Sequence, residues 1–317
     1  MKQGFILGKF DPLHRGHEAL IAEARLHCDQ LSILVLGDPK TESPGWQRYQ
    51  WVKNTWPDLQ VVQVAGGLEQ ALQFIARHPG KKKILLDGLG KWKMLNLPPL
   101  VDYYRIYEEA TSDLPSTRVI RRQPYSHHHF LLPVSRAAFV HRIALVGPES
   151  CGKSFLAEKL AAHYNTVHVE EYGRTYCEKF GMDSTDLDFA HVAGGQLYRE
   201  DEMALQANKV LFCDTELLVT QIWSEVYFKG KCQPWIYWAN HERHYAHFLL
   251  CAPDIPWVND GLREFEYARS WMFDRLLEEL ECRQLPFSVI HGGFEERWAK
   301  ATVVVEQVIG TKGGGTS

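Results

Sequence analysis

The fold of this 317-residue chain is decided by the stretch Ile143-Ala-Leu-Val-Gly147-Pro-Glu-Ser-Cys-Gly152-Lys153-Ser154. Its first four residues form a short apolar run typical of a buried strand, and residues 155–164 have the apolar spacing of a helix. The loop between them matches Gly-x-x-x-x-Gly-Lys-Ser/Thr, in the strand-loop-helix context that this motif requires. The backbone N–H groups of such a loop and the positive end of the following helix can surround a phosphate. The stretch therefore predicts a site for a nucleoside triphosphate.

Two side chains of this loop have specific roles in phosphate binding. Lys153 is expected to reach the outer phosphates, and Ser154 to hold a magnesium ion. The alternative is a Gly-rich turn with a chance Lys-Ser pair, which the flanking strand and helix disfavour. Cys151 is either a small side chain that fills space in the loop, which we favour, or an oxidation-sensitive thiol. The residues expected to contact the nucleotide are Gly147, Glu149, Ser150, Cys151, Gly152, Lys153 and Ser154.

The composition is that of an ordinary globular protein. Hydrophobic residues make up 45%, charged residues 23% and the net charge is −4, so no nucleic-acid or membrane partner is expected. No apolar run approaches the about 20 residues of a membrane span, and the first residues enter a strand pattern at once, which predicts no signal peptide. The seven scattered cysteines never form Cys-x-x-Cys, which suits reduced thiols in the cytoplasm and disfavours a disulfide framework or zinc site.

Strand and helix patterns alternate on both sides of the phosphate loop. Strand-helix-strand units join parallel strands, so we expect an α/β protein of two domains, each a parallel sheet covered by helices. The predicted boundaries are 1–125 for the first domain, 126–139 for a linker, 140–309 for the second domain and 310–317 for a disordered Gly-rich tail. Strands are predicted at 5–7, 31–37, 59–64, 83–87, 143–146, 166–171, 209–215, 245–251 and 287–290. Helices are predicted around 19–26, 46–56, 68–77, 155–164, 188–206, 266–283 and 295–308.

Two stretches near the predicted boundary are expected to be without regular structure. Residues 91–124 are rich in Pro and Tyr and are expected to be irregular. Residues 127–129 are three successive histidines, which could suggest a metal site. Three neighbours in a regular element cannot all face one ion, so a solvated loop is favoured.

A second chemical motif, Gly8-Lys-Phe-Asp-Pro-Leu-His14-Arg-Gly16-His17, follows the first strand at the start of a helix. Two imidazoles three residues apart at a helix N-terminus form an anion site together with the helix dipole. Such a site can stabilise charge on an α-phosphate while pyrophosphate leaves, without a covalent nucleophile. A bare His-x-Gly-His pattern also fits a metal pair or surface histidines. The whole string is more specific, and it resembles the signature of the nucleotidyltransferase superfamily, in particular its nicotinamide-nucleotide adenylyltransferases.

That superfamily has a second signature, Ser/Thr-rich and ending in Arg, which grips the triphosphate at another helix start. Residues 116–121, Ser-Thr-Arg-Val-Ile-Arg, are similar to it, although Arg118 departs from the small hydroxyl residue often found there. Arg48 and Trp51 either resemble the family's nucleotide-side helix or belong to an amphipathic helix with a core Trp. The resemblance implies ATP contacts from Gly8, Lys9, Phe10, His14, Gly16, His17, Ser116 and Arg121.

Polar residues follow several strands predicted in the second domain. Asp214 ends an apolar strand, where it either acts on the magnesium shell or caps the strand. Glu170, Glu171 and Arg174 follow the strand after the phosphate-loop helix, at the carboxyl edge where ligands bind in open α/β sheets. A carboxylate there can deprotonate an attacking sugar hydroxyl, and the sequence leaves open whether Glu171 or Asp214 does so. Arg263 suits a lid that closes on the transferring phosphate.

In this order, the motifs of the two domains resemble the NadR family, in which an adenylyltransferase domain precedes a ribosylnicotinamide kinase domain. The similar kinase strings are the phosphate loop, Glu171-Tyr-Gly-Arg174, Asp214-Thr and Trp257-Val-Asn-Asp260-Gly-Leu-Arg263. Trp257 either stacks on a ring or anchors its loop in the core. Some members of the family add an N-terminal helix-turn-helix domain. No such segment precedes the first strand here, so repression is not expected.

The resemblance implies a fold and two activities. The first domain is expected to be a nucleotidyltransferase-type, Rossmann-like parallel sheet, and the second a P-loop kinase parallel sheet. The kinase would phosphorylate nicotinamide riboside, and the transferase would adenylylate nicotinamide mononucleotide to give NAD and pyrophosphate. ATP would be the co-substrate of both steps and Mg²⁺ the cofactor. The alternatives are a kinase whose first domain is weak or inactive, and a non-catalytic ATP/NAD sensor.

The residues that this resemblance implies fall into three groups. The catalytic residues would be His14, His17, Lys153, Glu171, Asp214 and Arg263. The substrate-binding residues of the kinase would be Glu170, Glu171, Tyr172, Arg174, Trp257 and Asp260. The metal ligands would be Ser154 and Asp214. The expected partners are small molecules alone, and whether the chain forms a homo-oligomer is left open.

Overall fold

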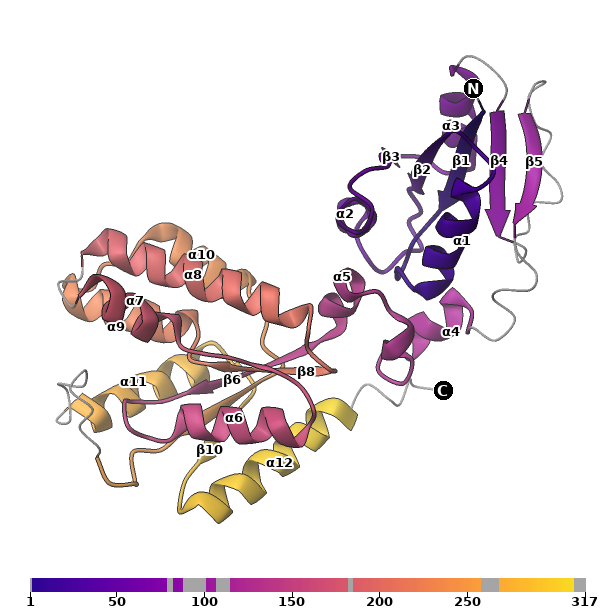
Figure 1. The fold of residues 1–317 in the computed structure, drawn as a ribbon. Helices are drawn as coiled ribbons and strands as arrows, with labels where there is room; N and C mark the ends of the chain where they lie inside the picture. Colours follow the sequence, from indigo (N-terminus) through magenta and orange to yellow (C-terminus); the bar gives the residue numbers. More distant parts are fainter. Residues whose placement is uncertain are drawn as a thin grey trace. The chain divides into compact units, whose positions relative to one another are not determined.

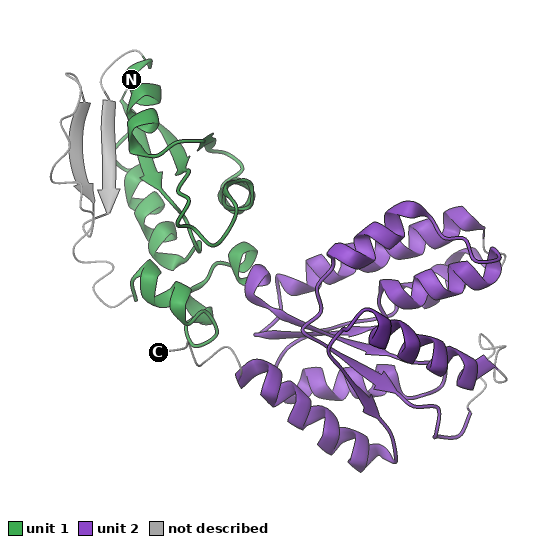
Figure 2. Cartoon of the chain, turned by 180° about the vertical axis from the view of Figure 1, so that it is seen from behind, with its two compact units in different colours: residues 1–136 green, residues 137–317 purple. Residues whose placement is uncertain are grey.

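The chain forms two compact units, residues 1–136 and 137–317 (Figure 2). The structure, a computed structural model, describes residues 2–78, 82–87, 101–106, 115–181, 185–257 and 268–310, with only the backbone for 82–87 and 101–106. In each unit helices cover a parallel sheet, so the predicted α/β class with parallel sheets is confirmed (Figure 1).

Unit 1 contains a five-stranded parallel sheet with the strand order β3-β2-β1-β4-β5. Its strands are β1 (Gln3–Gly8), β2 (Gln30–Leu36), β3 (Gln60–Val64), β4 (Lys82–Asp87) and β5 (Val101–Ile106). Its helices are α1 (Arg15–Arg25), α2 (Gly45–Thr55), α3 (Leu68–Ala76), α4 (Thr117–Arg122), η2 (His128–Phe130) and α5 (Pro133–Arg136). One face of β1 and β2 packs on α3, where Ala71 and Ile75 are fully buried. The four middle residues of the central strand β1, 4–7, are buried because both faces of the strand are covered.

Unit 2 contains a second five-stranded parallel sheet, with the order β10-β9-β6-β8-β7. Its strands are β6 (His141–Val146), β7 (His168–Val169), β8 (Val210–Asp214), β9 (His247–Cys251) and β10 (Phe287–Ile290). Its helices are η3 (Ala137–Phe139), α6 (Lys153–His163), α7 (Tyr172–Phe180), α8 (Asp186–Ala204), α9 (Leu217–Tyr227), α10 (Pro234–Glu242), α11 (Arg269–Cys282) and α12 (Phe294–Gly310). Two apolar clusters form the core, one under α8, α9 and α11 and the other under α6 and α12. Because β6 is the middle strand, its carboxyl end places the phosphate loop centrally at one edge of the sheet.

Most of the predicted strands and helices are confirmed with small shifts of their ends, but the prediction is wrong or incomplete in three respects. Residues 91–124 are not irregular throughout, since they contain β5 and α4. The strand β5 lies at the edge of the sheet and pairs with β4. This pairing with a neighbouring strand is not visible in the local sequence. The strand predicted at 166–171 is shortened to β7, because Glu171 is already the N-cap of α7. The sequence does not predict the helices α7, α9 and α10. In α9 seven residues are buried, so this helix lacks the exposed polar stripe by which an amphipathic helix is recognised.

The stretch 126–139, expected to be a linker, contains η2, α5 and η3. Its Ser135 is fully buried, and the Ser135 hydroxyl donates to the carbonyl oxygen of Leu13. Leu131 also forms a β-bridge with His14. The first part of this stretch, up to residue 136, is therefore an integral part of unit 1, next to the His-x-Gly-His motif. The predicted tail lies outside the described residues from position 311 onward.

Candidate active sites

The phosphate loop connects β6 to α6 and requires its two glycines for different reasons. Gly147 has φ 146° and Gly152 has φ 80°, both in the region that favours glycine. A Cβ added to Gly147 would lie 2.6 Å from the carbonyl oxygen of Cys251, at the end of the neighbouring strand. Cys151 is buried, and its thiol donates to the Pro148 carbonyl at 2.9 Å, so its side chain stabilises the loop from inside.

The Lys153 ammonium is folded back onto its own loop. Its Nζ donates to the carbonyl oxygens of Gly147 at 3.0 Å and Pro148 at 2.8 Å. Burial disfavours the ammonium, but electrostatic interactions with the Cys151 sulfur and with the carboxylates of Asp214 and Glu171 hold the pKa of Lys153 above its usual value. The side chain is therefore a cation at neutral pH. A bound phosphate would take the place of these carbonyl oxygens as its partner.

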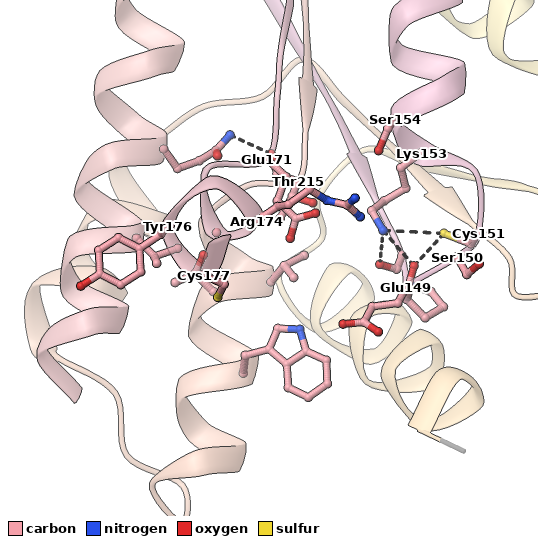
Figure 3. A pocket seen from close by; sticks show the side chains of 18 of the residues that line it. Glu149, Ser150, Cys151, Lys153, Ser154, Glu171, Arg174, Tyr176, Cys177 and Thr215 are labelled. Carbon is pink, nitrogen blue, oxygen red and sulfur yellow. Dashed lines mark hydrogen bonds between the residues drawn. The ribbon is translucent and has the colours of Figure 1, made fainter. Parts of the chain in front are cut away.

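A cavity of about 440 Å³ opens beside this loop (Figure 3). Residues 147–155 form one wall, and side chains of α7, α8 and α9 form the other. Glu171, Arg174 and Lys153 extend into it from opposite walls (Figure 3). The cavity combines a phosphate-binding loop with a second compartment large enough for a small organic molecule.

Glu171 and Asp214, the two candidate bases, occupy different places around this cavity. Glu171 is the N-cap of α7 and lines the cavity. Burial raises the pKa of Glu171, against the opposing charge of Lys153. Asp214 ends β8 and is 2% exposed, and it is not among the residues that line the cavity. Only Glu171 is therefore placed to touch an acceptor molecule in this cavity.

The donor set near the loop fits a magnesium ion that is held mainly by phosphate. Asp214 Oδ1 is buried and has no hydrogen-bond partner in the described part of the chain. Ser154 is exposed in the first turn of α6 and lines the cavity. Among the described residues no group of three His, Cys, Asp or Glu could hold a metal by itself. Mg²⁺ in phosphate-transferring sites needs only one or two protein ligands, since the nucleotide and water supply the others.

Several residues expected to bind substrate lie away from the cavity. Glu170 is exposed, and the Tyr172 ring packs between α7 and α8 under the Arg199 guanidinium, at 4.8 Å from its centroid. Neither residue lines the cavity. The Trp257 ring faces Arg269 at 5.7 Å and is not in the cavity wall either. Asp260 and Arg263 lie outside the described residues.

The far end of the cavity is aromatic and was not predicted from the sequence. It is lined by Tyr176, Phe189, Trp223 and Tyr227, together with the carboxylate of Asp188. Asp188 accepts hydrogen bonds from the Thr185 and Tyr176 hydroxyls, which lower the pKa of Asp188 to about 2. Thr185-x-x-Asp188 is a capping box, a signal that locates the start of α8. Tyr176, Trp223 and Tyr227 come from α7 and α9, which the sequence did not reveal, and Phe189 from the predicted helix α8, so their grouping was not predictable.

In unit 1, His14 and His17 are oriented by the backbone at the start of α1. His14 is the N-cap, and its Nδ1 accepts the Gly16 N–H at 3.0 Å. The Nδ1 of His17 accepts the His14 N–H at 3.2 Å, which completes a capping box. Because both Nδ1 atoms are acceptors, each neutral ring carries its proton on Nε2. The two rings, with centroids 4.0 Å apart, therefore present donors to a ligand.

Both imidazoles are neutral at physiological pH. Burial lowers the pKa of His14 to about 4. Burial, and then the proximity of His14, lower the pKa of His17 well below its usual value. The site therefore offers neutral hydrogen-bond donors to an anion, together with the N-terminus of α1.

The two signatures predicted in unit 1 meet in the structure. His14 Nε2 lies 2.8 Å from the Thr117 hydroxyl, across 103 residues of sequence. Thr117 is the first residue of α4, and Ser116 caps that helix by accepting the Val119 N–H. Two helix N-termini thus converge on one place, which gives a single anion-binding region.

Other residues expected to bind ATP in unit 1 have protein partners. Arg121 Nη1 lies 3.3 Å from the Asp11 carboxylate, and Lys9 pairs with Asp38. Arg48 is fully buried and donates to three backbone carbonyls, so it organises the loops after β1 and β2. Phe10 is buried with φ 52°, and its ring contacts that of His17 at 4.9 Å. Gly8 lies under the Phe10 ring, which a Cβ would meet at 2.9 Å.

Comparison with known proteins matches the whole chain. The family model described as "AAA domain" matches residues 142–297. The chain is 26% identical over 343 aligned positions to the trifunctional NAD biosynthesis/regulator protein NadR of Escherichia coli strain K12, covering 97% of this chain and 83% of that protein. It is 26% identical over 346 positions to the protein of the same name from Salmonella typhimurium strain LT2, covering 98% of this chain and 84% of that protein.

Solved structures agree on the fold. A NadR protein in complex with NR superposes with a TM-score of 0.81 at 21% identity, covering 100% of this chain and 98% of that chain. A NadR protein in complex with NAD and AMP-PNP gives a TM-score of 0.76 at 20% identity, with the same coverage. None of the helices in the described part of the chain is long and apolar enough to span a membrane.

Proposed function

The chain is homologous to the NadR proteins, and from this premise we propose that it is a bifunctional enzyme of NAD biosynthesis. Unit 2 would transfer the γ-phosphate of ATP to nicotinamide riboside, giving nicotinamide mononucleotide and ADP. Unit 1 would transfer the AMP part of a second ATP to the mononucleotide, giving NAD and pyrophosphate. The observation that carries the kinase half is the cavity that places Glu171 opposite the phosphate loop.

In the proposed kinase step the ribose 5′-hydroxyl attacks the γ-phosphorus. Glu171 accepts the proton of this hydroxyl as the new P–O bond forms, and ADP leaves. Burial raises the pKa of Glu171, which makes its carboxylate a stronger base, and the charge of Lys153 opposes this rise. Ser154 and Asp214 would hold the Mg²⁺, which offsets charge on the β- and γ-phosphates. Asp214 therefore takes the metal role and Glu171 the role of base.

In the proposed adenylyl transfer the mononucleotide phosphate attacks the α-phosphorus of ATP. The Nε2–H group of His17 would donate to the oxygens on which negative charge accumulates, and that of His14 would do so in exchange for its Thr117 partner. The N-termini of α1 and α4 add their partial positive charge at the same place. No proton needs to leave either ring, so neutral imidazoles suffice. The orientation of both rings by backbone N–H groups supports this role.

The test supplies purified protein with ATP, Mg²⁺ and one acceptor at a time. With nicotinamide riboside, we expect mononucleotide and ADP in equal amounts. With nicotinamide mononucleotide, we expect NAD and pyrophosphate in equal amounts. The proposal fails for unit 2 if riboside is not phosphorylated, and for unit 1 if mononucleotide gives no NAD. Failure of both steps with retained ATP binding would favour the non-catalytic sensor.

A second candidate function is a kinase whose unit 1 is weak or inactive. The observation that favours it is the Arg121 side chain, which pairs with Asp11 and lies 3.7 Å from Glu42 instead of projecting freely toward the His14 site. In this case the riboside reaction proceeds and the mononucleotide reaction does not. Replacement of Glu42 by Gln would then increase the second rate if the ion pair is what restrains Arg121.

A further inference from the structure

Gln196 of α8 has a polar side chain and lies in the wall of the kinase cavity. None of the sequence motifs includes it. It is 2% exposed, although glutamine is seldom so buried without partners. Its Oε1 accepts the backbone N–H of Tyr172 at 3.0 Å, and its Nε2 donates to the carbonyl oxygen of Thr215 at 3.2 Å. One amide thus connects the two segments that follow β7 and β8.

The first of these segments carries Glu171. Tyr172 is the first residue of α7 and directly follows Glu171. The hydrogen bond that the Tyr172 N–H donates to Gln196 therefore fixes the peptide group between Glu171 and Tyr172. The same helix α8 fixes Tyr172 in two other ways. A Cβ on Gly195 would lie 2.1 Å from the Tyr172 ring, so the ring packs against bare backbone, and the Arg199 guanidinium lies over the ring at 4.8 Å from its centroid. Glu171 is therefore positioned by α8 as well as by its own strand.

The second segment carries Thr215. This residue has φ 68°, a strained left-handed conformation for a β-branched side chain, and it needs backbone bonds to stay there. Its N–H donates to Leu145 and its carbonyl oxygen accepts from Gln196. Thr215 lines the cavity, and its hydroxyl is buried with no hydrogen-bond partner in the described part of the chain. The left-handed turn thus leaves an unpaired hydroxyl at the cavity wall.

We propose that Gln196 is a positioning residue of the kinase, which sets the place of Glu171 relative to Thr215 and so aligns the acceptor hydroxyl for phosphoryl transfer. This rests on the proposed kinase activity of unit 2. The geometry assigns Thr215 as a hydroxyl that binds the acceptor, since it faces the cavity on the same side as Glu171. The amide of Gln196 is suited to the task because it donates to one segment and accepts from the other.

The experiment compares Gln196→Leu with Gln221→Leu in the full chain. Gln221 is a matched control: it is also 2% exposed in unit 2 and bonds to Glu225, Asn240 and Arg283, but it does not line the cavity. For each variant we would measure kcat and KM with nicotinamide riboside, the Kd of ADP by calorimetry, and thermal unfolding. Rates are expressed per ADP-binding site, which removes the effect of unfolded protein.

We expect Gln196→Leu to lower kcat by about 10- to 100-fold, the range that follows from small misplacement of a reacting group. The Kd of ADP should stay within about twofold of wild type, because the bonds of the phosphate loop are unchanged. Gln221→Leu should lower the unfolding temperature and keep kcat per site. Equal kcat values for the two variants, or a parallel loss of ADP binding and kcat in Gln196→Leu, would overturn the positioning role.

Gln196→Glu is the second variant if the leucine variant does not fold. It keeps the size of the side chain and the acceptor for the Tyr172 N–H, but it cannot donate to Thr215 when ionised. We expect a kcat between those of wild type and Gln196→Leu, and a wild-type rate would contradict the role of the Thr215 bond. Absence of riboside phosphorylation by the wild-type protein would instead reject the kinase itself, and Gln196 would then have no such role.

Discussion

At the scale of single residues, His14 and His17 illustrate how backbone contacts define chemistry. The sequence pattern is compatible with a metal pair, surface histidines or an anion site. In the structure each Nδ1 atom accepts a backbone N–H, which leaves one Nε2–H donor on each ring. Burial also holds both rings neutral. The pair is therefore suited to donate hydrogen bonds, and less suited to act as a fixed cation.

A consequence at this scale is an acid-sensitive unit 1. The pKa of His14 is about 4 in the folded protein and near its ordinary value of 6.5 when unfolded, so the unfolded state binds more protons between these values. Stability should therefore fall as the pH falls from 6.5 toward 4, by at most about 3 kcal/mol from this group. Urea unfolding at pH 7 and pH 5 measures the loss, and His14→Asn, which keeps an N-cap acceptor, should lose less.

The control for this experiment is His129→Asn, an exposed histidine of the same unit. It should lose as much stability between the two pH values as the wild-type protein. If His14→Asn behaves like this control, burial of the His14 imidazole does not determine the acid sensitivity.

At the scale of elements, the packing of α7 on α8 places the Glu171 carboxylate. Two adjacent glycines of α8 have different surroundings. A Cβ on Gly195 would lie 2.1 Å from the Tyr172 ring, whereas a Cβ on Gly194 would meet nothing within 4 Å. The close approach of the two helices therefore depends on Gly195 alone, although both glycines occupy the same helix.

We predict opposite effects for the two alanine substitutions. Gly195→Ala should destabilise unit 2 by about 1–3 kcal/mol, because the ring must move or the helices must separate. It should also lower kcat with riboside, since Glu171 is displaced with α7. Gly194→Ala should be neutral or stabilise by about 0.5–1 kcal/mol through helix propensity. Thermal unfolding and initial rates of both variants test this, and equal stability of the two would contradict the close packing of Tyr172 on Gly195.

At the scale of the whole molecule, the chain contains two separate cores and two separate candidate sites. The apolar cluster of β1, β2 and α3 lies in unit 1, and the clusters under α8, α9 and α11 and under α6 and α12 lie in unit 2. The phosphate loop and the His14 site likewise belong to different units. Each candidate site is therefore built from side chains of its own unit.

The prediction at this scale is that each activity can be removed alone. Lys153→Ala should abolish phosphorylation of nicotinamide riboside, because it removes the ammonium that stabilises the transferring phosphate. It should leave NAD formation from the mononucleotide unchanged. His17→Ala should lower NAD formation by about 100- to 1,000-fold, the usual loss when one preorganised donor is removed, and leave the kinase unchanged. Both rates are measured on the same preparations. Loss of both activities from either single change would contradict two independent sites.

Much of the candidate chemistry was predictable because it lies in contiguous residues. The phosphate loop predicts its own geometry, since Gly147 and Gly152 are needed where the backbone turns sharply. The strand that ends in Asp214 and the helix that begins at His14 are also local features. Local patterns failed for β5, which depends on pairing with β4, and for α9, which is too uniformly buried to show a periodic pattern.

The sequence by itself therefore determined the α/β class, the parallel strands and the two nucleotide motifs, because each of these rests on neighbouring residues and on the periodicity of single elements. The tertiary structure alone decided which side chains share a site. It brought Thr117 to His14, placed Glu171 in the cavity and Asp214 beneath the loop, and moved Glu170, Tyr172 and Trp257 out of the cavity wall. It also introduced Gln196, whose bonds to Tyr172 and Thr215 join residues distant in the chain. Such contacts depend on how helices pack across the sheet, and no local pattern records that packing.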